Sequence, residues 1–228
     1  MPEKEIVCLA FSRKNGGNCF AGIELETGLW IRAIGGRAGG ALSDFECYMQ
    51  VGNDPYAVPK KLDVIKIGFI GPERSSVQPE NWKISGTPWG RVRQANAADI
   101  DLLKRHITDD PEVFRGYEDR VPVEDIERRP PNYSLALVRP SSLRWQSKTG
   151  YHGRRQSRGT FAVSGVTYDL SLTDDDYAAL LPQQGTGVTN GLSDRKVDML
   201  LTISLGDAYH GNHYKLIAGV IRLPRNPI

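Results

Sequence analysis

The chain has 228 residues and a nearly balanced charge, with 29 Lys and Arg against 27 Asp and Glu. Its 39% hydrophobic and 25% charged residues are typical of a soluble globular protein and exclude a disordered chain, while the length allows one large domain or two small ones. Without an apolar run of ~18–20 residues, a signal-peptide pattern at the start or paired cysteines, the sequence predicts a cytoplasmic, reduced protein that does not bind membranes.

In the first half, short β-branched and aromatic segments predict a mainly β structure. Turns rich in glycine, Asn15-Gly16-Gly17 and Glu26-Thr27-Gly28, separate the first three strands and have the composition of hairpin turns. The predicted strands cover residues 6–12, 19–25, 29–34 and 62–70. A helix is predicted over residues 97–106, because its acidic residues come early and its basic residues late.

The second half predicts several strands, one helix and two final strands. The strands cover residues 134–139, 143–145, 160–163, 167–172, 198–205 and 214–223, and the helix covers residues 173–181, with Thr173 as its N-cap and Pro182 after its end. This order matches the OB-fold, a five-stranded partly open barrel. The first half matches the opening meander of the same fold.

The fold class is therefore predicted as mainly β, with two OB-fold-like antiparallel barrels and few short helices. We predict a first OB-like barrel with an irregular insert at residues 1–107, a charged linker at residues 108–131 and a second OB-like barrel at residues 132–228. Segments 8–23 and 201–220 share the order of apolar strand, Gly-Asn turn, aromatic residue and Ala-Gly, which indicates an internal duplication.

The charge is distributed unevenly along the chain. From Arg128 to Tyr168, 41 residues contain no Asp or Glu but eight Lys or Arg, so the remaining residues carry +2 − 8, about −6. Aromatic residues alternate with these cations. Cations that follow phosphates and rings that stack on bases are typical of proteins that bind single-stranded nucleic acid.

Two sets of residues are candidate nucleic-acid contacts. The larger set lies in a loop between strands one and two, or two and three, of the second barrel, and comprises Arg144, Trp145, Lys148, Tyr151, Arg154, Arg155 and Arg158. The smaller set lies in the first half and comprises Arg13, Lys14, Trp30 and Arg32. The alternative is a solvated hairpin tip, with Trp145 and Trp30 as core residues.

Other residues carry weaker signals of binding or catalysis. Trp82 and Trp89 are either a second stacking patch or rings that pack a loop onto the barrel. His210 and His213 flank a Gly-Asn turn, so their spacing fixes no shared metal-binding face. Neither a nucleophile motif nor a phosphate-binding glycine loop is present. We therefore expect neither enzymatic activity nor a cofactor or metal.

Four segments with strand and turn motifs, residues 8–19, 28–32, 78–81 and 204–217, together extend over most of the chain. They resemble the dual OB-containing domain family of bacteria and archaea. The resemblance implies two OB-like barrels, a nucleic-acid role and an accessory place in defence or repair-type systems. It implies no catalytic residues.

The sequence thus favours non-enzymatic binding of single-stranded DNA or RNA by the second barrel. Two alternatives stay open: a module that docks an acidic protein partner, and a sensor for a nucleotide or another small ligand. Salt dependence distinguishes them, because polymer binding weakens steeply with salt and increases with strand length, whereas mononucleotide binding does neither.

Overall fold

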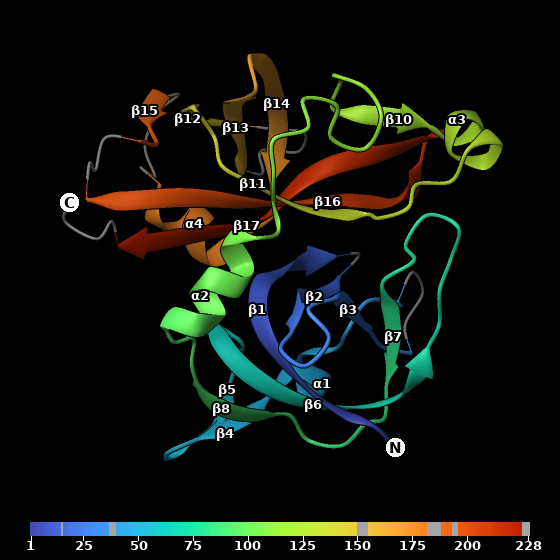
Figure 1. Ribbon diagram of the computed structural model, residues 1–228, viewed down its shortest axis with the longest axis vertical. Coiled ribbons are helices and arrows are strands. Elements are labelled where there is room, and N and C mark those ends of the chain that lie inside the picture. The colour runs from blue at the N-terminus through green and yellow to red at the C-terminus, as the bar shows by residue number, and fades with distance from the viewer. Residues whose placement is uncertain (15, 37–39, 150–154, 182–187, 193–195, 225–228) are drawn as a thin grey trace. The chain divides into compact units, whose positions relative to one another are not determined.

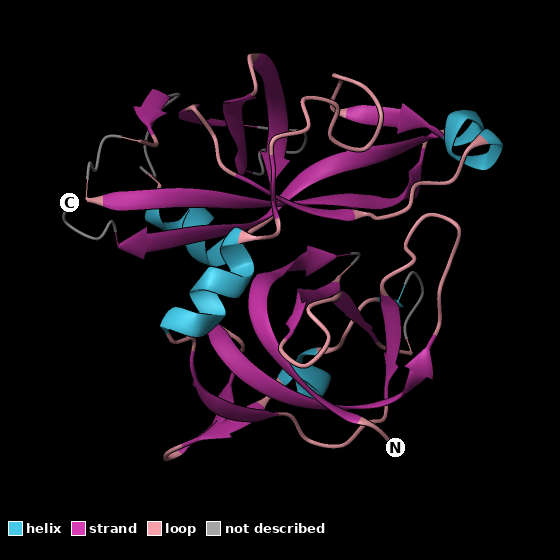
Figure 2. Cartoon of the chain, in the orientation of Figure 1, coloured by secondary structure: helices cyan, strands magenta, loops and turns pink. Residues whose placement is uncertain are grey.

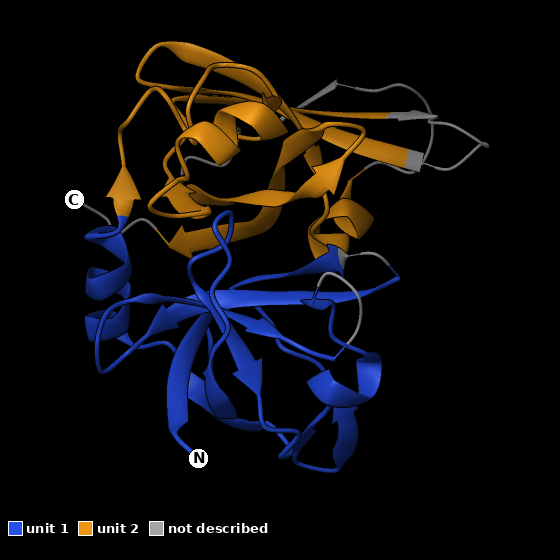
Figure 3. Ribbon diagram, turned by 90° about the vertical axis from the view of Figure 1, so that its right-hand side faces the viewer, with its two compact units in different colours: residues 1–106 blue, residues 107–228 orange. Residues whose placement is uncertain are grey.

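The computed structural model describes residues 1–14, 16–36, 40–149, 155–181, 188–192 and 196–224 (Figure 1). Strands contain 54% of the residues and helices 13%, which confirms the predicted mainly β class (Figure 2). The chain divides into two compact units, Met1–His106 and Ile107–Ile228 (Figure 3). No helix in the described part is long and apolar enough to cross a membrane.

Unit 1 is built mainly from strands. In chain order it contains β1 (Glu3–Lys14), β2 (Gly17–Glu24), β3 (Trp30–Ile34), α1 (Asp44–Cys47), β4 (Met49–Val51), β5 (Asp54–Ala57), β6 (Asp63–Pro72), β7 (Asn81–Ile84), β8 (Gly90–Gln94) and α2 (Ala97–Lys104). The β2–β3 hairpin turns at Gly28, whose φ of +70° favours glycine, and its ends are joined by a Glu24 N–H···O Leu29 bond of 2.9 Å.

Five strands of unit 1 close into a barrel. They pair in the order β1-β2-β3-β7-β6, and β1 pairs again with β6. Only the β3–β7 pair in this ring is parallel. The insert between β3 and β6 holds α1 and the β4–β5 hairpin, so α1 takes the place of the OB-fold helix between the third and fourth barrel strands.

The interior of this barrel is apolar and aromatic. Phe20, Ile65 and Phe69 are fully buried within it. Trp89 joins the same cluster, with its ring 5.0 Å from the ring of Phe20 in an edge-on arrangement. Rings in such contacts contribute both buried area and a specific geometry, so Trp89 belongs to the core and does not form a surface stacking patch.

The main sheet of unit 2 is larger than that of unit 1, because short additional strands pair at its margins. In chain order it contains β9 (Ile107–Thr108), β10 (Arg120–Pro122), α3 (Val123–Arg128), β11 (Leu135–Val138), β12 (Ser142–Thr149), β13 (Arg155–Val163), β14 (Val166–Leu172), α4 (Asp175–Leu180), β15 (Val188–Asn190), β16 (Val197–Tyr209) and β17 (Asn212–Pro224). The central strand order is β12-β13-β14-β17-β16-β11, and the β14–β17 pair is parallel.

The strand order of unit 2 repeats that of unit 1. Here β11 and β12 together take the place of β1: β11 pairs with β16, as β1 pairs with β6, and β12 pairs with β13, as β1 pairs with β2. The strand equivalent to β1 is interrupted between β11 and β12 at Pro140, because proline has no N–H to donate to a β-ladder. As predicted, the helix lies between the third and fourth barrel strands, although Asp174 and not Thr173 is its N-cap.

Two sequence expectations about the organisation are corrected. Residues 108–131 are not a separate linker, because β9 pairs with β11 and β10 pairs with β17 inside unit 2. The similarity between segments 8–23 and 201–220 also does not identify equivalent strands. It relates β1–β2 to β16–β17, whereas the shared strand order makes β16–β17 equivalent to β6–β7. The similarity of those segments reflects what strand–turn–strand sequences have in common.

Candidate nucleic-acid interface

The β12-β13-β14 sheet has one polar face and one apolar face. Strand alternation sends Leu143, Trp145 and Phe161 into the core. The opposite face carries the polar side chains of Arg144, Gln146, Gln156, Arg158, Thr160, Asp169 and Ser171, which are exposed or half-buried. In the ladder, Arg144 lies opposite Thr160, and Thr160 lies opposite Asp169. This polar face occupies the second and third barrel strands and the adjoining half of the first.

The predicted basic segment is the β12–β13 hairpin. It therefore connects the first and second barrel strands, and not the second and third. Loops at this position frame the oligonucleotide site of OB-folds, which lies on the face of strands two and three. Lys148 pairs with Gln156, and Thr149 pairs with Arg155, in the hairpin ladder. Tyr151 and Arg154 lie outside the described residues.

The two described arginines of this face differ in their contacts. Arg144 is exposed and forms no ion pair within the part of the chain that the structure describes. Arg158 is only 14% exposed in its side chain. Its Nε donates to Asp169 Oδ1 at 2.9 Å, and its Nη1 donates to Ser171 Oγ at 3.0 Å. Of the predicted nucleic-acid contacts, Arg158 is therefore already paired with a carboxylate inside the chain.

A second carboxylate also approaches Arg158. Asp119 Oδ2 lies 3.6 Å from Arg158 Nη2, and the other carboxylate oxygen of Asp119 accepts a 2.8 Å hydrogen bond from Arg120 Nε. Asp119 lies just before β10, so this carboxylate connects the polar face with the segment that holds β10 and α3. Arg158 is held in a fixed orientation at the edge of the face.

Trp145 lies in the core of unit 2 and is 1% exposed. Its ring centroid is 5.0 Å from that of Tyr177 on α4. A Cβ atom placed on Gly159 would lie 2.7 Å from the indole ring, so the glycine makes room for it. The proposed role of Trp145 as a base-stacking platform is thereby corrected: the residue alternates with Arg144 along β12 and faces the opposite way.

The candidates of unit 1 do not form one site. Arg13 is exposed near the end of β1, where its Nη1 lies 3.5 Å from Asp44 Oδ1. The backbone of Lys14 ends the same strand. Trp30 is half-buried at the start of β3, whereas Arg32 two residues later is 1% exposed, with its Nη1 3.9 Å from Cys19 Sγ. Arg32 therefore has a buried role and does not contact phosphate.

The two histidines flanking the β16–β17 turn do not converge. His213 is buried, with Nδ1 2.9 Å from the carbonyl oxygen of Gly206, and His210 lies on the turn with its ring against Tyr209. Among the described residues there is no group of three His, Cys, Asp or Glu side chains placed to hold a metal ion.

Sequence reasoning missed an exposed aromatic cluster in unit 1. The rings of Phe45, Tyr48 and Tyr56 form a chain of edge-on contacts, with centroid distances of 5.7 and 5.3 Å. Phe45 is 83% exposed and Tyr56 is 67% exposed. A usable signal was present, because Ser43 and Glu46 form a capping box that begins α1 and places Phe45 in its first turn.

The sequence comparison agrees with the architecture of the two units. The family model of the dual OB-containing domain matches residues 4–220, which is nearly the whole chain. No curated protein sequence matches it.

Proposed function

Because the chain belongs to the dual OB-containing domain family, we propose that it binds single-stranded DNA or RNA without catalysing a reaction. The observation that carries this proposal is the polar face of β12-β13-β14. It is the face on which OB-folds bind oligonucleotides, it is solvent-exposed, and it combines an unpaired arginine with amide and hydroxyl donors. An accessory role in a bacterial defence or repair-type system is part of the same proposal, implied by the family resemblance.

The contacts of this face favour the phosphate backbone over the bases. Arg144, Gln146 and Gln156 carry donors suited to phosphate oxygens, while no aromatic side chain is exposed on the described part of the face. Trp145 is turned inward. Binding should therefore depend on strand length and salt and discriminate weakly among bases.

The salt dependence follows from the number of available cations. Arg158 already pairs with Asp169, so Arg144 is the cation of the described face that can take a phosphate, and the sequence adds three more cations at positions 148, 154 and 155. Four neutralised phosphates at ~0.7 each give a slope of log affinity against log salt of roughly −2 to −3.

The test is fluorescence anisotropy of the full chain with labelled single-stranded DNA, single-stranded RNA and duplex DNA at several salt concentrations. Arg144→Gln should weaken single-strand binding by roughly 3- to 10-fold and reduce the slope by about 0.7. Arg105→Gln, which removes an exposed arginine from unit 1, is the matched control and should leave both values unchanged.

Two results would contradict the proposal. A slope near zero for every strand excludes binding through phosphates. Equal losses in Arg144→Gln and Arg105→Gln would mean that net charge, and not this face, attracts the strands.

A second candidate function, docking of a protein partner, is favoured by the aromatic cluster of Phe45, Tyr48 and Tyr56. Aromatic rings are enriched in protein interfaces, and exposed neighbouring rings in a monomer are uncommon. If no strand binds at any salt concentration, this candidate replaces the first.

A further inference from the structure

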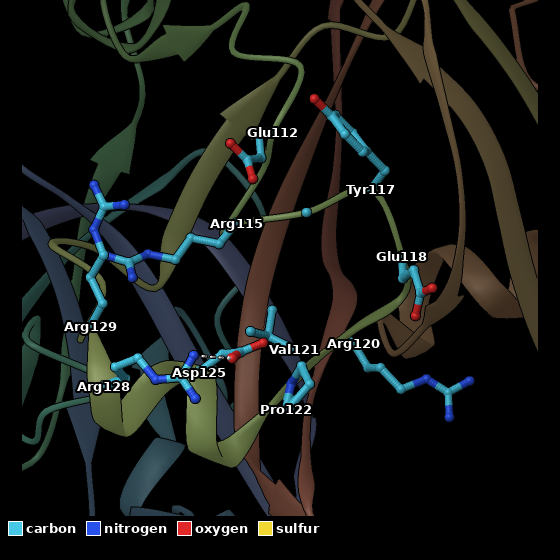
Figure 4. A pocket seen from close by; sticks show the side chains of 11 residues that line it. Glu112, Arg115, Tyr117, Glu118, Arg120, Val121, Pro122, Asp125, Arg128 and Arg129 are labelled. Carbon is cyan, nitrogen blue, oxygen red and sulfur yellow. Dashed lines mark ion pairs between the residues drawn. The ribbon is translucent and has the colours of Figure 1, made fainter.

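A cleft of about 650 Å³ lies in unit 2 (Figure 4). Its walls come from the loop before β10, from β10 and from α3, a region that the sequence predicted as a linker. The volume falls within the range of small-molecule sites. Four of the residues that line the cleft are arginines: Arg115, Arg120, Arg128 and Arg129.

Three of these arginines come together on the α3 side of the cleft. Arg115 Nη2 donates a 3.0 Å hydrogen bond to the carbonyl oxygen of Pro130, which fixes Arg115 beside the end of α3. Arg128 is the last residue of that helix, and Arg129 is its C-cap. In Figure 4, Arg115, Arg128 and Arg129 occupy the same side, whereas Arg120 extends away on the other.

The charges of these arginines are only partly compensated. Arg128 Nη1 lies 3.5 Å from Asp125 Oδ1, an exposed pair one helical turn apart. Arg115 and Arg129 form no ion pair with any carboxylate in the described ranges. On the α3 side three guanidinium groups face the single carboxylate of Asp125, and over the whole lining four arginines against Glu112, Glu118 and Asp125 leave a net charge of +1. A phosphate monoester carries close to −2 at neutral pH, and guanidinium groups bind such oxygens with paired hydrogen bonds.

The loop that presents Arg115 has an unusual backbone. Phe114, Arg115 and Gly116 have φ values of +52°, +58° and +106°, so two residues with side chains adopt the left-handed region in succession. Backbone strain of this kind persists only where surrounding contacts impose it, and it is concentrated at functional sites.

Contacts from the core hold this loop in place. The hydroxyl of Tyr168 accepts from Val113 N–H at 3.1 Å and donates to the carbonyl oxygen of Pro111. Lys215 Nζ donates to the carbonyl oxygen of Gly116 at 2.6 Å. Arg115 is therefore positioned before any ligand arrives, which lowers the entropy that binding costs.

We propose that this cleft binds the phosphate monoester of a nucleotide, as a free nucleoside monophosphate or as the phosphorylated end of a strand. Tyr117 lines the same cleft with a ring that is 58% exposed, suitable for stacking on the base. Glu112 and Glu118 line the remaining wall, so additional phosphates of a triphosphate would meet carboxylates.

The position of Asp119 relates the cleft to the polar face. Its carboxylate contacts both Arg120, which lines the cleft, and Arg158, which belongs to the face. A strand whose end occupies the cleft would thus continue toward the face. Phosphate binding in the cleft does not require strand binding on the polar face, so an experiment can contradict either proposal without contradicting the other.

The experiment compares the full chain with adenosine, adenosine monophosphate and adenosine triphosphate by calorimetry. It also compares, by anisotropy, one oligonucleotide with a phosphate or a hydroxyl at its 5′ or 3′ end. We expect the monophosphate to bind at least ~10-fold more tightly than adenosine and more tightly than the triphosphate. If only strands occupy the cleft, we expect a similar preference for one phosphorylated end.

Variants assign the effect to the cleft. Arg115→Gln combined with Arg129→Gln should abolish the preference for phosphate while the affinity for the hydroxyl-terminated strand is unchanged. Arg144→Gln should weaken both strands equally and keep their ratio, and Arg105→Gln should change neither. Arg115 has a left-handed backbone, so the double variant can lose stability. If its melting temperature is lower than that of the wild type, the single variant Arg129→Gln, at an exposed position, replaces it in this test.

The proposal is overturned if adenosine monophosphate binds no better than adenosine and strands with and without a terminal phosphate bind equally. Tighter binding of the triphosphate would also overturn it, because the carboxylates of the cleft should disfavour a longer anion. Monophosphate binding without strand binding would support the cleft and contradict the proposed function of the polar face.

Discussion

Lys215 and Gly116 are 99 residues apart in the chain, yet Lys215 Nζ donates a 2.6 Å hydrogen bond to the carbonyl oxygen of Gly116. The lysine is 1% exposed and also lies 5.4 Å from the ring centroid of Tyr168. Burial lowers its pKa to about 8, although Glu112, Asp119 and Glu118 act in the opposite direction. One buried amine thus holds the loop that presents Arg115.

The first prediction is a pH-dependent stability that originates at Lys215. Between its folded pKa of about 8 and its unfolded pKa of 10.5 the unfolded state binds more protons, so the free energy of unfolding rises with pH across this window. The pKa difference corresponds to roughly 3 kcal/mol. Lys215→Met should remove this rise, as measured by urea unfolding at pH 7.5 and pH 10.5.

The exposed Lys66 is the matched control for Lys215. Lys66→Met should keep the slope of the wild-type protein, because this side chain is exposed and lies in unit 1, far in sequence from the loop that Lys215 holds in unit 2. Parallel pH profiles for the wild type and Lys215→Met would show that the buried amine does not titrate as its environment implies.

The second prediction concerns Asp174, which joins α4 to β17. Its Oδ1 accepts from Tyr177 N–H at 3.2 Å, and its Oδ2 accepts from Val220 N–H at 2.9 Å, in a fully buried position. Asp174→Ala removes a helix cap and leaves a buried N–H unsatisfied, which should lower the free energy of unfolding by about 2–4 kcal/mol. Denaturant unfolding measures the loss.

The neighbouring Asp175 provides the comparison. It is exposed in the first turn of α4, where a carboxylate near a helix N-terminus contributes less than ~1 kcal/mol, so Asp175→Ala should cost much less than Asp174→Ala. Similar losses for both variants would contradict the bridging role of Asp174.

The third prediction follows from the buried Trp145. Trp145→Ala should lower the free energy of unfolding by about 3–5 kcal/mol, because it leaves a cavity next to Tyr177. Thermal melting by circular dichroism checks the stability, and the affinity of the folded fraction for single strands should equal that of the wild type. Weakened binding at unchanged melting temperature would restore the stacking role.

The fourth prediction concerns the thiols. Cys8, Cys19 and Cys47 are all buried, and burial, with a smaller effect of Glu46, raises the pKa of Cys47 to about 12. Because the thiolate is the reactive form, a thiol reagent at pH 7–8 should label the three cysteines only after denaturation. Fast labelling of the native protein at Cys47 would contradict this environment.

Much of the fold was predictable because its signals are local. The turn at Ser164 and Gly165 adopts positive φ at both residues, and the strands on either side alternate between inward and outward residues. The full length of β12 was harder to recognise, because the outward residues Arg144 and Gln146 interrupt its apolar pattern. The same alternation nevertheless contained the information that Trp145 and Arg144 face opposite ways.

The site was less predictable because it depends on distant contacts. The pairing of Arg158 with Asp169 connects neighbouring strands and was within reach of a register argument. The contact of Arg158 with Asp119 was not, since it requires the path of the segment before β10. Arg115 comes close to Arg129 because the backbone at Phe114 and Arg115 is left-handed. Sequence does not predict this conformation at residues other than glycine.

The interruption at Pro140 has a consequence for engineering unit 2. One ladder ends with Val138 on β11, and the next begins with Ser142 on β12, so neither depends on the covalent connection between them. In unit 1 the equivalent strand is continuous, and its ladders with β6 and β2 meet at Ile6 and Val7. Added residues beside the exposed Arg139 would therefore interrupt no backbone pairing, so unit 2 should accept a short insertion on this side of the buried Pro140, whereas the equivalent strand of unit 1 should not.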